Sequence, residues 1–315
     1  MCSQKGLMNM TEANALTTNA AIGALLPLPE HEDNKFSRGN ALIIAGSKRY
    51  AGAAVLATLA ATRGGAGYVT LATVPMAAAA LRAQQPTVPV VELAPTPHPS
   101  KYDQNTSIFP SENTFDKLFD LAMNANAVLI GPGLGRDPEL TSFVRKLVKK
   151  IAENDKGPKL VLDADALFAF SGDDLFELPG KYPIVLTPHP VELERLTGTS
   201  DPTSGRAQAL TLHNFTLVAK GPDTHILSEG RYDLDESGPA SLATAGSGDV
   251  LAGMLVALLA QGLKRHEAAV CAVRLQALAA LAAEEEMTPL CVNARDLIDY
   301  IPVAAAELLM AADRM

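Results

Sequence analysis

The chain repeats one local pattern, in which a short apolar run ends at glycine or polar residues and a helical segment follows. Residues Asn40–Ala45 form such a run between Gly39 and Gly46, and the alanine-rich stretch 52–63 then follows with helical character. An apolar run without alternation is typical of a strand buried on both faces of a parallel sheet. The pattern therefore predicts an α/β fold, with a mainly parallel central sheet and helices on both faces.

The same pattern recurs along most of the chain. Further strands are predicted at residues 65–73, 88–93, 127–130, 159–162, 184–186 and 217–219, and a turn-rich hairpin at 224–234. Helices are predicted at residues 75–85, 115–124, 139–153, 267–286 and 295–312. Residues 86–114 are rich in proline, and no structure is predicted there beyond the strand at 88–93. With no linker or internal repeat in view, residues 35–315 are expected to form one domain after an N-terminal lead over residues 1–34.

Composition restricts the partners and the compartment. The chain has 26 lysines and arginines against 35 aspartates and glutamates, for a net charge of −9. An acidic surface disfavours nucleic acid and anionic membranes as main partners. No apolar stretch reaches the ~18 residues of a membrane span, and the first residues lack the pattern of a secretion signal. Three cysteines are too few for a disulfide framework, so the cytoplasm is the expected location.

Residues 243–262 contain the segment with the clearest chemistry. Gly246, Ser247 and Gly248 form a glycine-rich turn, which is followed by Asp249 and then by an apolar run of helical period. The backbone N–H groups of such a turn and of a new helix point to one spot, which suits an anion such as a phosphate. Asp249 in the first helical turn is placed either to act as a base beside that anion or to cap the helix.

Other strand ends carry glycine or polar residues at the edge where open α/β sheets bind ligands. The GPGLG segment, residues 131–135, is interpreted on its own as a tight structural turn. Asp163 and Asp165 follow a predicted strand and are candidates for metal binding or substrate orientation. The alternative is that Asp165 caps a helix starting at Ala166.

His189 and Lys220 follow two further predicted strands. His189 lies between two prolines, which fix the backbone, and together with Glu192 it is a candidate for ligand contact. The alternative for Glu192 is a favourable charge at a helix N-terminus. Lys220 with Gly221 is a candidate for contact with a nucleotide phosphate or ribose, or else an exposed lysine before a turn.

Several common site motifs are absent from the sequence. It has no GxxxxGK[ST] phosphate loop, no GxGxxG with a distal acidic residue and no GxSxG nucleophile segment. Zinc-ligand spacings are also missing, so no metal site built by the protein alone is predicted. These absences disfavour a Rossmann dehydrogenase and a serine hydrolase.

Seven segments occur along the chain in the order KFSRGNALIIAGS, GAAVLATLAATRGGAGYVTLAT, GPGLG, VLDADAL, LTPHPVELERL, KGPDT and LATAGSGDVLAGMLVALLAQG. Together they resemble the ADP-dependent NAD(P)H-hydrate dehydratases, a family of the ribokinase-like superfamily. The resemblance runs from about Lys35 through the terminal NARDLIDYIP. It implies a three-layer αβα ribokinase-like fold with a central, mainly parallel sheet.

The resemblance also implies an activity. Members of this family use ADP or ATP as co-substrate to phosphorylate the hydroxyl of hydrated NADH or NADPH. Phosphate is then lost, which restores the dihydronicotinamide and releases AMP or ADP, and Mg²⁺ usually accompanies the nucleotide. Phosphorylation converts a poor leaving group into a good one, and Asp249 is the implied catalytic base. The implied substrate-binding residues are Ala53, Gly133, His189 and Asp249, and the implied nucleotide-binding residues are Lys220, Gly221, Pro222, Asp223, Thr224, Gly246, Ser247 and Gly248.

The sequence departs from the family pattern at Phe36, Val191, Pro239 and Gln276, none of which removes a proposed catalytic group. Residues 1–34 are too few for the family's epimerase domain, so a separate epimerase is an expected partner, and a homo-oligomer, a tetramer as in family members, is expected. Two alternatives stay open: a ribokinase-like kinase of a small vitamin-precursor alcohol, and a catalytically silent nucleotide-binding regulator. The LTPHPVELERL and KFSRG segments favour the dehydratase over the kinase, and Asp249 with an intact glycine turn argues against the regulator.

Overall fold

A computed structural model describes residues 18–93, 111–170, 174–179, 182–228 and 230–314 of the chain. Most of the proline-rich stretch, residues 94–110, and the first part of the N-terminal lead, residues 1–17, lie outside the described residues.

The described residues form a nine-stranded sheet with the strand order β3-β2-β1-β4-β5-β6-β7-β8-β9. Pairing is parallel from β3 through β7 and antiparallel in the hairpin of β8 and β9, as predicted. The parallel part places the carboxyl ends of β1, β4, β5, β6 and β7 along one edge. The strands are β1 (Asn40–Ile44), β2 (Tyr68–Thr73), β3 (Val90–Glu92), β4 (Ala127–Ile130), β5 (Lys159–Leu162), β6 (Ile184–Leu186), β7 (Phe215–Ala219), β8 (Thr224–Ser228) and β9 (Arg231–Asp235).

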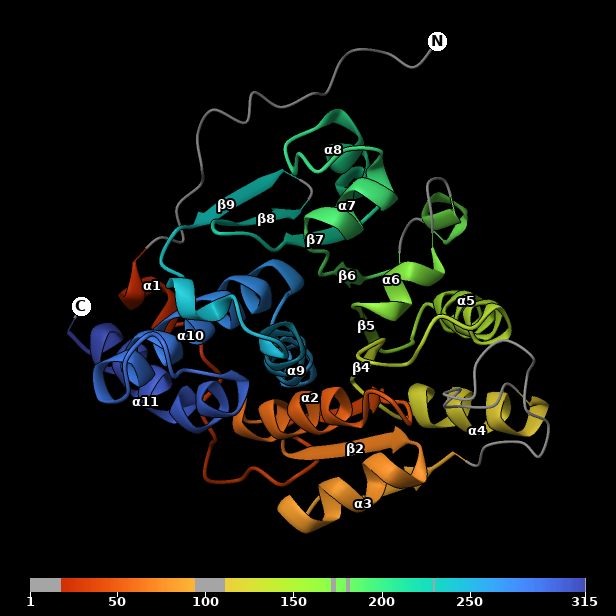
Figure 1. Cartoon of the computed structure of the whole chain (residues 1–315), viewed down its shortest axis with the longest axis horizontal. Coiled ribbons are helices and arrows are strands. Elements are labelled where there is room, and N and C mark those ends of the chain that lie inside the picture. The colour runs from red at the N-terminus through yellow and green to blue at the C-terminus, as the bar shows by residue number, and fades with distance from the viewer. Residues whose placement is uncertain (1–17, 94–110, 171–173, 180–181, 229, 315) are drawn as a thin grey trace.

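Helices cover both faces of the sheet, which confirms the predicted three-layer α/β architecture (Figure 1). In that view α9, α10 and α11 lie on one side, and α4 to α8 lie on the other. The sequence analysis gives no bounds for α7, whose start is implied only by the interpretation of Glu192, and does not include α8; each has eight residues. The helices are α1 (Asn19–Gly23), α2 (Ala51–Arg63), α3 (Pro75–Gln84), α4 (Glu112–Met123), α5 (Pro138–Ala152), α6 (Asp165–Ala169), α7 (Pro190–Thr197), α8 (Gly205–Leu212), α9 (Ser247–Ala260), α10 (Arg265–Glu286) and α11 (Ala294–Ala312), with short 3₁₀ turns at Asp174–Glu177 and Ala240–Leu242.

Helix α9 is the central helix of the core. Every residue from Val250 to Ala260 is buried, and the helix packs against β1, β4, β5 and α2. At Gly253 the backbones of α9 and α2 meet, because a β-carbon there would lie only 2.2 Å from the Ala57 carbonyl oxygen. This close packing fixes the N-terminus of α9 over the carboxyl edge of the sheet.

Among the described residues, α10 is long and apolar enough by length and composition to cross a membrane, but 78% of its apolar window is buried inside the fold. Buried polar contacts attach it to the hairpin of β8 and β9. His266 on α10 lies 2.6 Å from Asp233 through Nε2 and 2.9 Å from the Ser228 hydroxyl through Nδ1. The helix therefore has the environment of a core helix.

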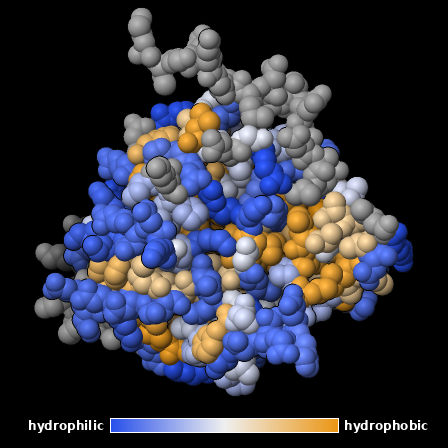
Figure 2. Space-filling model, turned by 180° about the vertical axis from the view of Figure 1, so that it is seen from behind, coloured by the Kyte–Doolittle hydropathy of each residue, from blue (hydrophilic) through white to orange (hydrophobic). Residues whose placement is uncertain are grey.

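Apolar side chains also reach the surface. Val303 and Met310 on α11 are each about half exposed, at 50% and 53%. Figure 2 shows apolar surface gathered on part of one face of the molecule. Contiguous exposed apolar surface is a common property of protein interaction sites.

Candidate active site

The N-terminus of α9 confirms the predicted glycine turn. Gly246 is the N-cap residue and has a left-handed backbone, with φ of 93°. The left-handed conformation favours glycine here, and a β-carbon would also lie 2.6 Å from Leu56 Cδ1. Asp249 is the third residue of the helix and not its cap, so the capping interpretation of Asp249 is wrong. Its carboxylate still lies in the first turn, where the helix dipole favours a negative charge.

A buried ion pair lies beside this turn. Asp163, at the end of β5, is 1% exposed, and its Oδ1 accepts hydrogen bonds from Thr187 Oγ1 at 2.7 Å and Lys220 Nζ at 2.9 Å. The Lys220 ammonium also reaches the glycine turn, because a β-carbon at Gly248 would lie 3.4 Å from Nζ. The ends of β5, β6 and β7 thus meet the start of α9, as expected for the carboxyl edge of a parallel sheet.

The two key ionisable groups of this cluster have shifted pKa values. Burial and the neighbouring Asp163 carboxylate raise the pKa of Asp249 to about 7, against the opposing effect of Lys220. Burial acts to lower the pKa of Lys220, but the carboxylates of Asp163 and Glu192 outweigh it, so that pKa stands above its ordinary value. A carboxyl group that titrates near neutrality is suited to general-base chemistry, and the lysine beside it remains cationic.

The structure confirms that the GPGLG segment, residues 131–135, forms a tight turn. Gly131, Gly133 and Gly135 all have positive φ, at 135°, 60° and 100°. A β-carbon at Gly133 would lie 2.7 Å from Tyr50 Cβ and 2.9 Å from Ala53 Cβ. Two of the implied substrate-binding residues, Ala53 in the first turn of α2 and Gly133 in the loop after β4, are therefore in close contact.

Asp165 holds this loop in place. Its Oδ2 accepts a hydrogen bond from Gly135 N at 2.8 Å, and its Oδ1 pairs with Arg136 Nε at 2.7 Å. The predicted capping role of Asp165 is wrong, because the N-cap of α6 is Ala164 and no side chain caps that helix. The Asp165 carboxylate instead binds the GPGLG loop, thirty residues earlier in the chain. Within the described ranges, no group of three His, Cys, Asp or Glu side chains is arranged to hold a metal ion.

His189 is the N-cap of α7. Its Nδ1 accepts hydrogen bonds from the backbone N–H groups of Val191 and Glu192, at 3.2 and 3.4 Å. The Glu192 carboxylate in turn accepts from the His189 backbone N–H at 2.9 Å, which completes a capping box. The predicted role of Glu192 at a helix N-terminus is confirmed. The three-residue spacing of His189 and Glu192 matches that of a capping box, which the sequence analysis does not identify. Contact of the His189 imidazole with a ligand stays a prediction.

The KGPDT segment forms the turn from β7 to β8. Gly221, Pro222 and Asp223 are exposed, and Thr224 is partly buried. Through Lys220 this turn adjoins the start of α9, so the structure brings the implied nucleotide-binding residues Lys220 and Gly248 together. The sequence reasoning names Gln276 only as a departure from the family pattern, and the structure shows its Nε2 donating to the Ser247 carbonyl at 2.6 Å. This contact joins two helices and leaves no local signal in the sequence.

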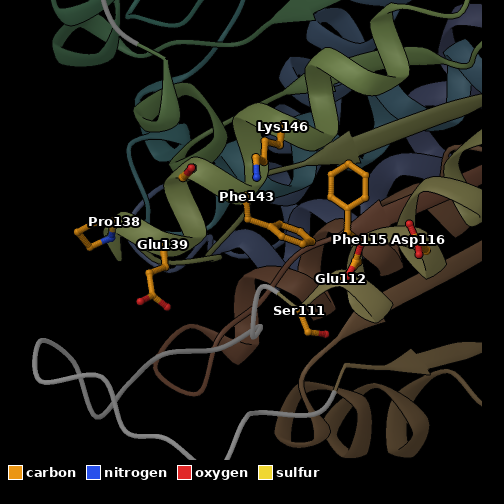
Figure 3. A pocket seen from close by; sticks show the side chains of 9 residues that line it. Ser111, Glu112, Phe115, Asp116, Pro138, Glu139, Phe143 and Lys146 are labelled. Carbon is orange, nitrogen blue, oxygen red and sulfur yellow. The ribbon is translucent and has the colours of Figure 1, made fainter.

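A separate hollow of about 730 Å³ lies between the N-terminal halves of α4 and α5 (Figure 3). Its walls include the edge-to-face pair of Phe115 and Phe143 and the side chain of Lys146. It contains none of the predicted site residues. The full lining is Ser111, Glu112, Phe115, Asp116, Pro138, Glu139, Ser142, Phe143 and Lys146.

Solved structures with the same fold identify the class of protein to which the chain belongs. A ribokinase-like superfamily protein from Enterococcus faecalis superposes with a TM-score of 0.76 at 25% identity, covering 92% of this chain and 95% of that one. An ADP/ATP-dependent NAD(P)H-hydrate dehydratase from Bacillus subtilis, co-crystallized with ATP/Mg²⁺, superposes with a TM-score of 0.73 at 26% identity, covering 93% and 100%. The fold is therefore ribokinase-like.

The family follows from the sequence match. The family model described as NAD(P)H-hydrate dehydratase matches residues 41–303, and the chain belongs to this family. The bifunctional NAD(P)H-hydrate repair enzyme Nnr of Salinibacter ruber is 39% identical over 298 residues, covering 92% of this chain and 52% of that protein. The corresponding protein of Moorella thermoacetica is 33% identical, covering 93% and 54%. The chain thus spans about half the length of these curated relatives.

Proposed function

We propose that the chain is an ADP- or ATP-dependent NAD(P)H-hydrate dehydratase, which restores NADH and NADPH from their hydrates. The observation that carries the proposal is the placement of Asp249 beside the glycine turn, with a pKa raised to about 7 and Lys220 close by. Membership of the dehydratase family supports the same assignment.

Asp249 is the proposed catalytic base. It accepts the proton of the ring hydroxyl while the terminal phosphoryl group of the nucleotide passes to that oxygen, which converts ADP to AMP or ATP to ADP. The phosphate then leaves with the carbon–oxygen bonding electrons, a proton is lost from the adjacent ring carbon, and the ring double bond returns. The N–H groups of Gly246 to Gly248 are proposed to stabilise the negative charge on the transferring group.

The nucleotide is proposed to lie over the start of α9, against residues 220–224 and 246–248. Lys220 supplies a fixed positive charge there because its pKa stands above the ordinary value. Mg²⁺ is proposed to arrive with the nucleotide phosphates, and the carboxylates of this acidic edge are oxygen donors of the kind it prefers. The solved Bacillus subtilis dehydratase with ATP/Mg²⁺ supports this choice of co-substrate.

The hydrate is proposed to lie against Ala53, Gly133, His189 and Asp249. An epimerase is proposed to work together with this activity, because the longer relatives are bifunctional repair enzymes. We further propose a homo-oligomer, a tetramer, in the cytoplasm, with the apolar surface of α11 as one contact face.

The test is an absorbance assay. The protein is incubated with hydrated NADH and ADP or ATP, and recovery of dihydronicotinamide absorbance is followed. Recovery is expected with at least one nucleotide, and Asp249→Asn is expected to reduce turnover by ~100-fold or more while keeping nucleotide affinity. Failure to recover NADH, with phosphorylation of a vitamin-precursor alcohol instead, would favour the kinase. Nucleotide binding without any turnover would favour the silent regulator.

A further inference from the structure

A cationic cluster lies around Phe168 on α6, outside the residues assigned above. The guanidinium carbon of Arg195, on α7, lies 3.4 Å from the centre of the Phe168 ring, and that of Arg136 lies 4.7 Å from it. Arg195 also donates a hydrogen bond from Nη2 to the Phe168 carbonyl at 3.0 Å. Stacking on an aromatic ring holds a guanidinium in a defined plane, so both cations are ordered before any ligand arrives.

The cluster carries surplus positive charge. Arg136 pairs with Asp165 at 2.7 Å, and Arg145 pairs with Asp174 at 3.2 Å. Among the residues that the structure describes, no carboxylate forms an ion pair with Arg195. Burial, followed by the charges of Arg136 and Arg145, lowers the pKa of Arg195 below its ordinary value. Such crowding of like charges on a chain of net charge −9 indicates a place for an anion.

The position of the cluster connects it to the proposed substrate side. Arg136 directly follows Gly135, whose backbone N–H is bound by Asp165. Arg195 lies on α7, the helix that begins after His189. The cluster is therefore attached to both segments, the GPGLG loop and the start of α7, that contain implied hydrate-binding residues.

The substrate of the proposed reaction has the matching chemistry. A hydrated dinucleotide carries a pyrophosphate, and its NADPH form carries an additional ribose phosphate. The glycine turn and Lys220 are assigned to the phosphates of the nucleotide, so the phosphates of the dinucleotide need a separate cationic site, and guanidinium groups bind phosphate oxygens in pairs. We propose that Arg136 and Arg195, held by Phe168, bind a phosphate group of the dinucleotide substrate. This inference rests on the proposed function for the identity of the ligand.

The test uses the unhydrated products NADH and NADPH as probes and measures their dissociation constants by nicotinamide fluorescence. Arg195→Gln and Arg136→Gln are each expected to weaken binding by ~10-fold or more, because a charge-assisted hydrogen bond is lost. Lys149→Gln removes an exposed charge from α5 as the matched control and is expected to change affinity less than ~2-fold. Affinity for ADP is expected to stay unchanged in all three variants.

The two probes distinguish the source of the phosphate. Equal weakening of NADH and NADPH assigns the pyrophosphate to the cluster, and weakening of NADPH alone assigns the ribose phosphate. Unchanged affinity in both arginine variants, or an equal loss of ADP affinity, overturns the inference, as does absence of NADPH binding to the unaltered chain. Binding needs no turnover, so failure of the proposed reaction is recognised separately in the absorbance assay.

Discussion

Asp249 combines a helical position with an environment that disfavours its charge. It lies in the first turn of α9, partly buried, near the Asp163 and Asp165 carboxylates that raise its pKa. Lys220 and the helix dipole act in the opposite direction. The resulting pKa of about 7 keeps the carboxyl group ready to accept a proton at neutral pH, at a cost to the folded state.

That cost predicts a pH-dependent stability difference between Asp249→Asn and the parent. The folded-state pKa of about 7 lies above the ordinary value of 3.8, so stability is lost as pH rises through 7 and the proton leaves. Asparagine has no such proton. The variant is therefore expected to gain on the parent by about 2–3 kcal/mol between pH 5 and pH 8, measured by urea unfolding at both pH values. The raised pKa would be contradicted if the free energy of unfolding of Asp249→Asn, minus that of the parent, stayed constant or fell from pH 5 to pH 8.

At the same scale, three of the four departures from the family pattern have defined local surroundings, and nothing in the structure explains Pro239. Phe36 lies 5.3 Å from the Tyr68 ring, with the Lys35 ammonium 5.0 Å from its centre. Val191 is 68% exposed in the first turn of α7, where a side chain has room. Gln276 bonds the first residue of α9.

At the level of elements, the GPGLG loop and the acidic edge are connected through Asp165. Asp165→Asn removes the ion pair with Arg136 and one of the carboxylates that raise the pKa of Asp249. The apparent pKa of the rise in kcat/KM with pH is therefore expected to fall below that of the parent, and KM for the hydrate to increase by ~10-fold. The measurement is a pH–rate profile with each substrate limiting in turn.

Asp155→Asn is the matched control for this prediction. Asp155 is exposed and precedes β5, at the opposite edge of the sheet, so its removal is expected to leave the profile unchanged. An unshifted profile in Asp165→Asn would show that Asp165 has no effect on the base. If Asp165→Asn raised KM for the nucleotide as much as KM for the hydrate, the substitution would have disrupted the whole site and not the hydrate side alone.

The contact of α2 with α9 gives a second prediction at this scale. Gly253→Ala places a methyl group against the Ala57 carbonyl, and the free energy of unfolding is expected to fall by about 2 kcal/mol. Gly205→Ala, at the open start of α8, is the control and is expected to be neutral or slightly stabilising. Urea titration measures both. Equal stability of the two variants would contradict close backbone packing at Gly253.

The helices and strands differ in how well the sequence predicts them. The strands β4 and β5 are continuous apolar runs, and burial on both faces explains why their sequence is sufficient. Helices α7 and α8 are short and mixed in polarity, so no period identifies them. Strand ends predict that Asp163, His189 and Lys220 lie at one edge, since parallel strands end together. Asp249 follows no strand, and the glycine turn before its helix is the signal that singles it out. The Thr187 and Gln276 contacts depend on which elements adjoin, which the sequence pattern alone does not specify.

For the whole molecule, the surface of α11 predicts self-association. Val303 and Met310, seven residues apart on this helix, lie on one face of it and are half exposed. Val303→Glu is expected to reduce the oligomer mass measured by light scattering, because a charge would be buried in the contact. Val191→Glu, at an exposed position on α7, is the control and is expected to leave the mass unchanged. A monomeric parent, or an unchanged mass in Val303→Glu, would exclude this face.

The most direct measurement of the proposed reaction is its stoichiometry. Hydrated NADH is supplied in limiting amount with excess ADP or ATP, and restored NADH, released phosphate and nucleotide product are quantified together. We predict one phosphate and one AMP or ADP for each NADH restored, with all three lost in Asp249→Asn. Consumption of nucleotide with a stable phosphorylated product and no restored NADH would contradict the dehydratase assignment.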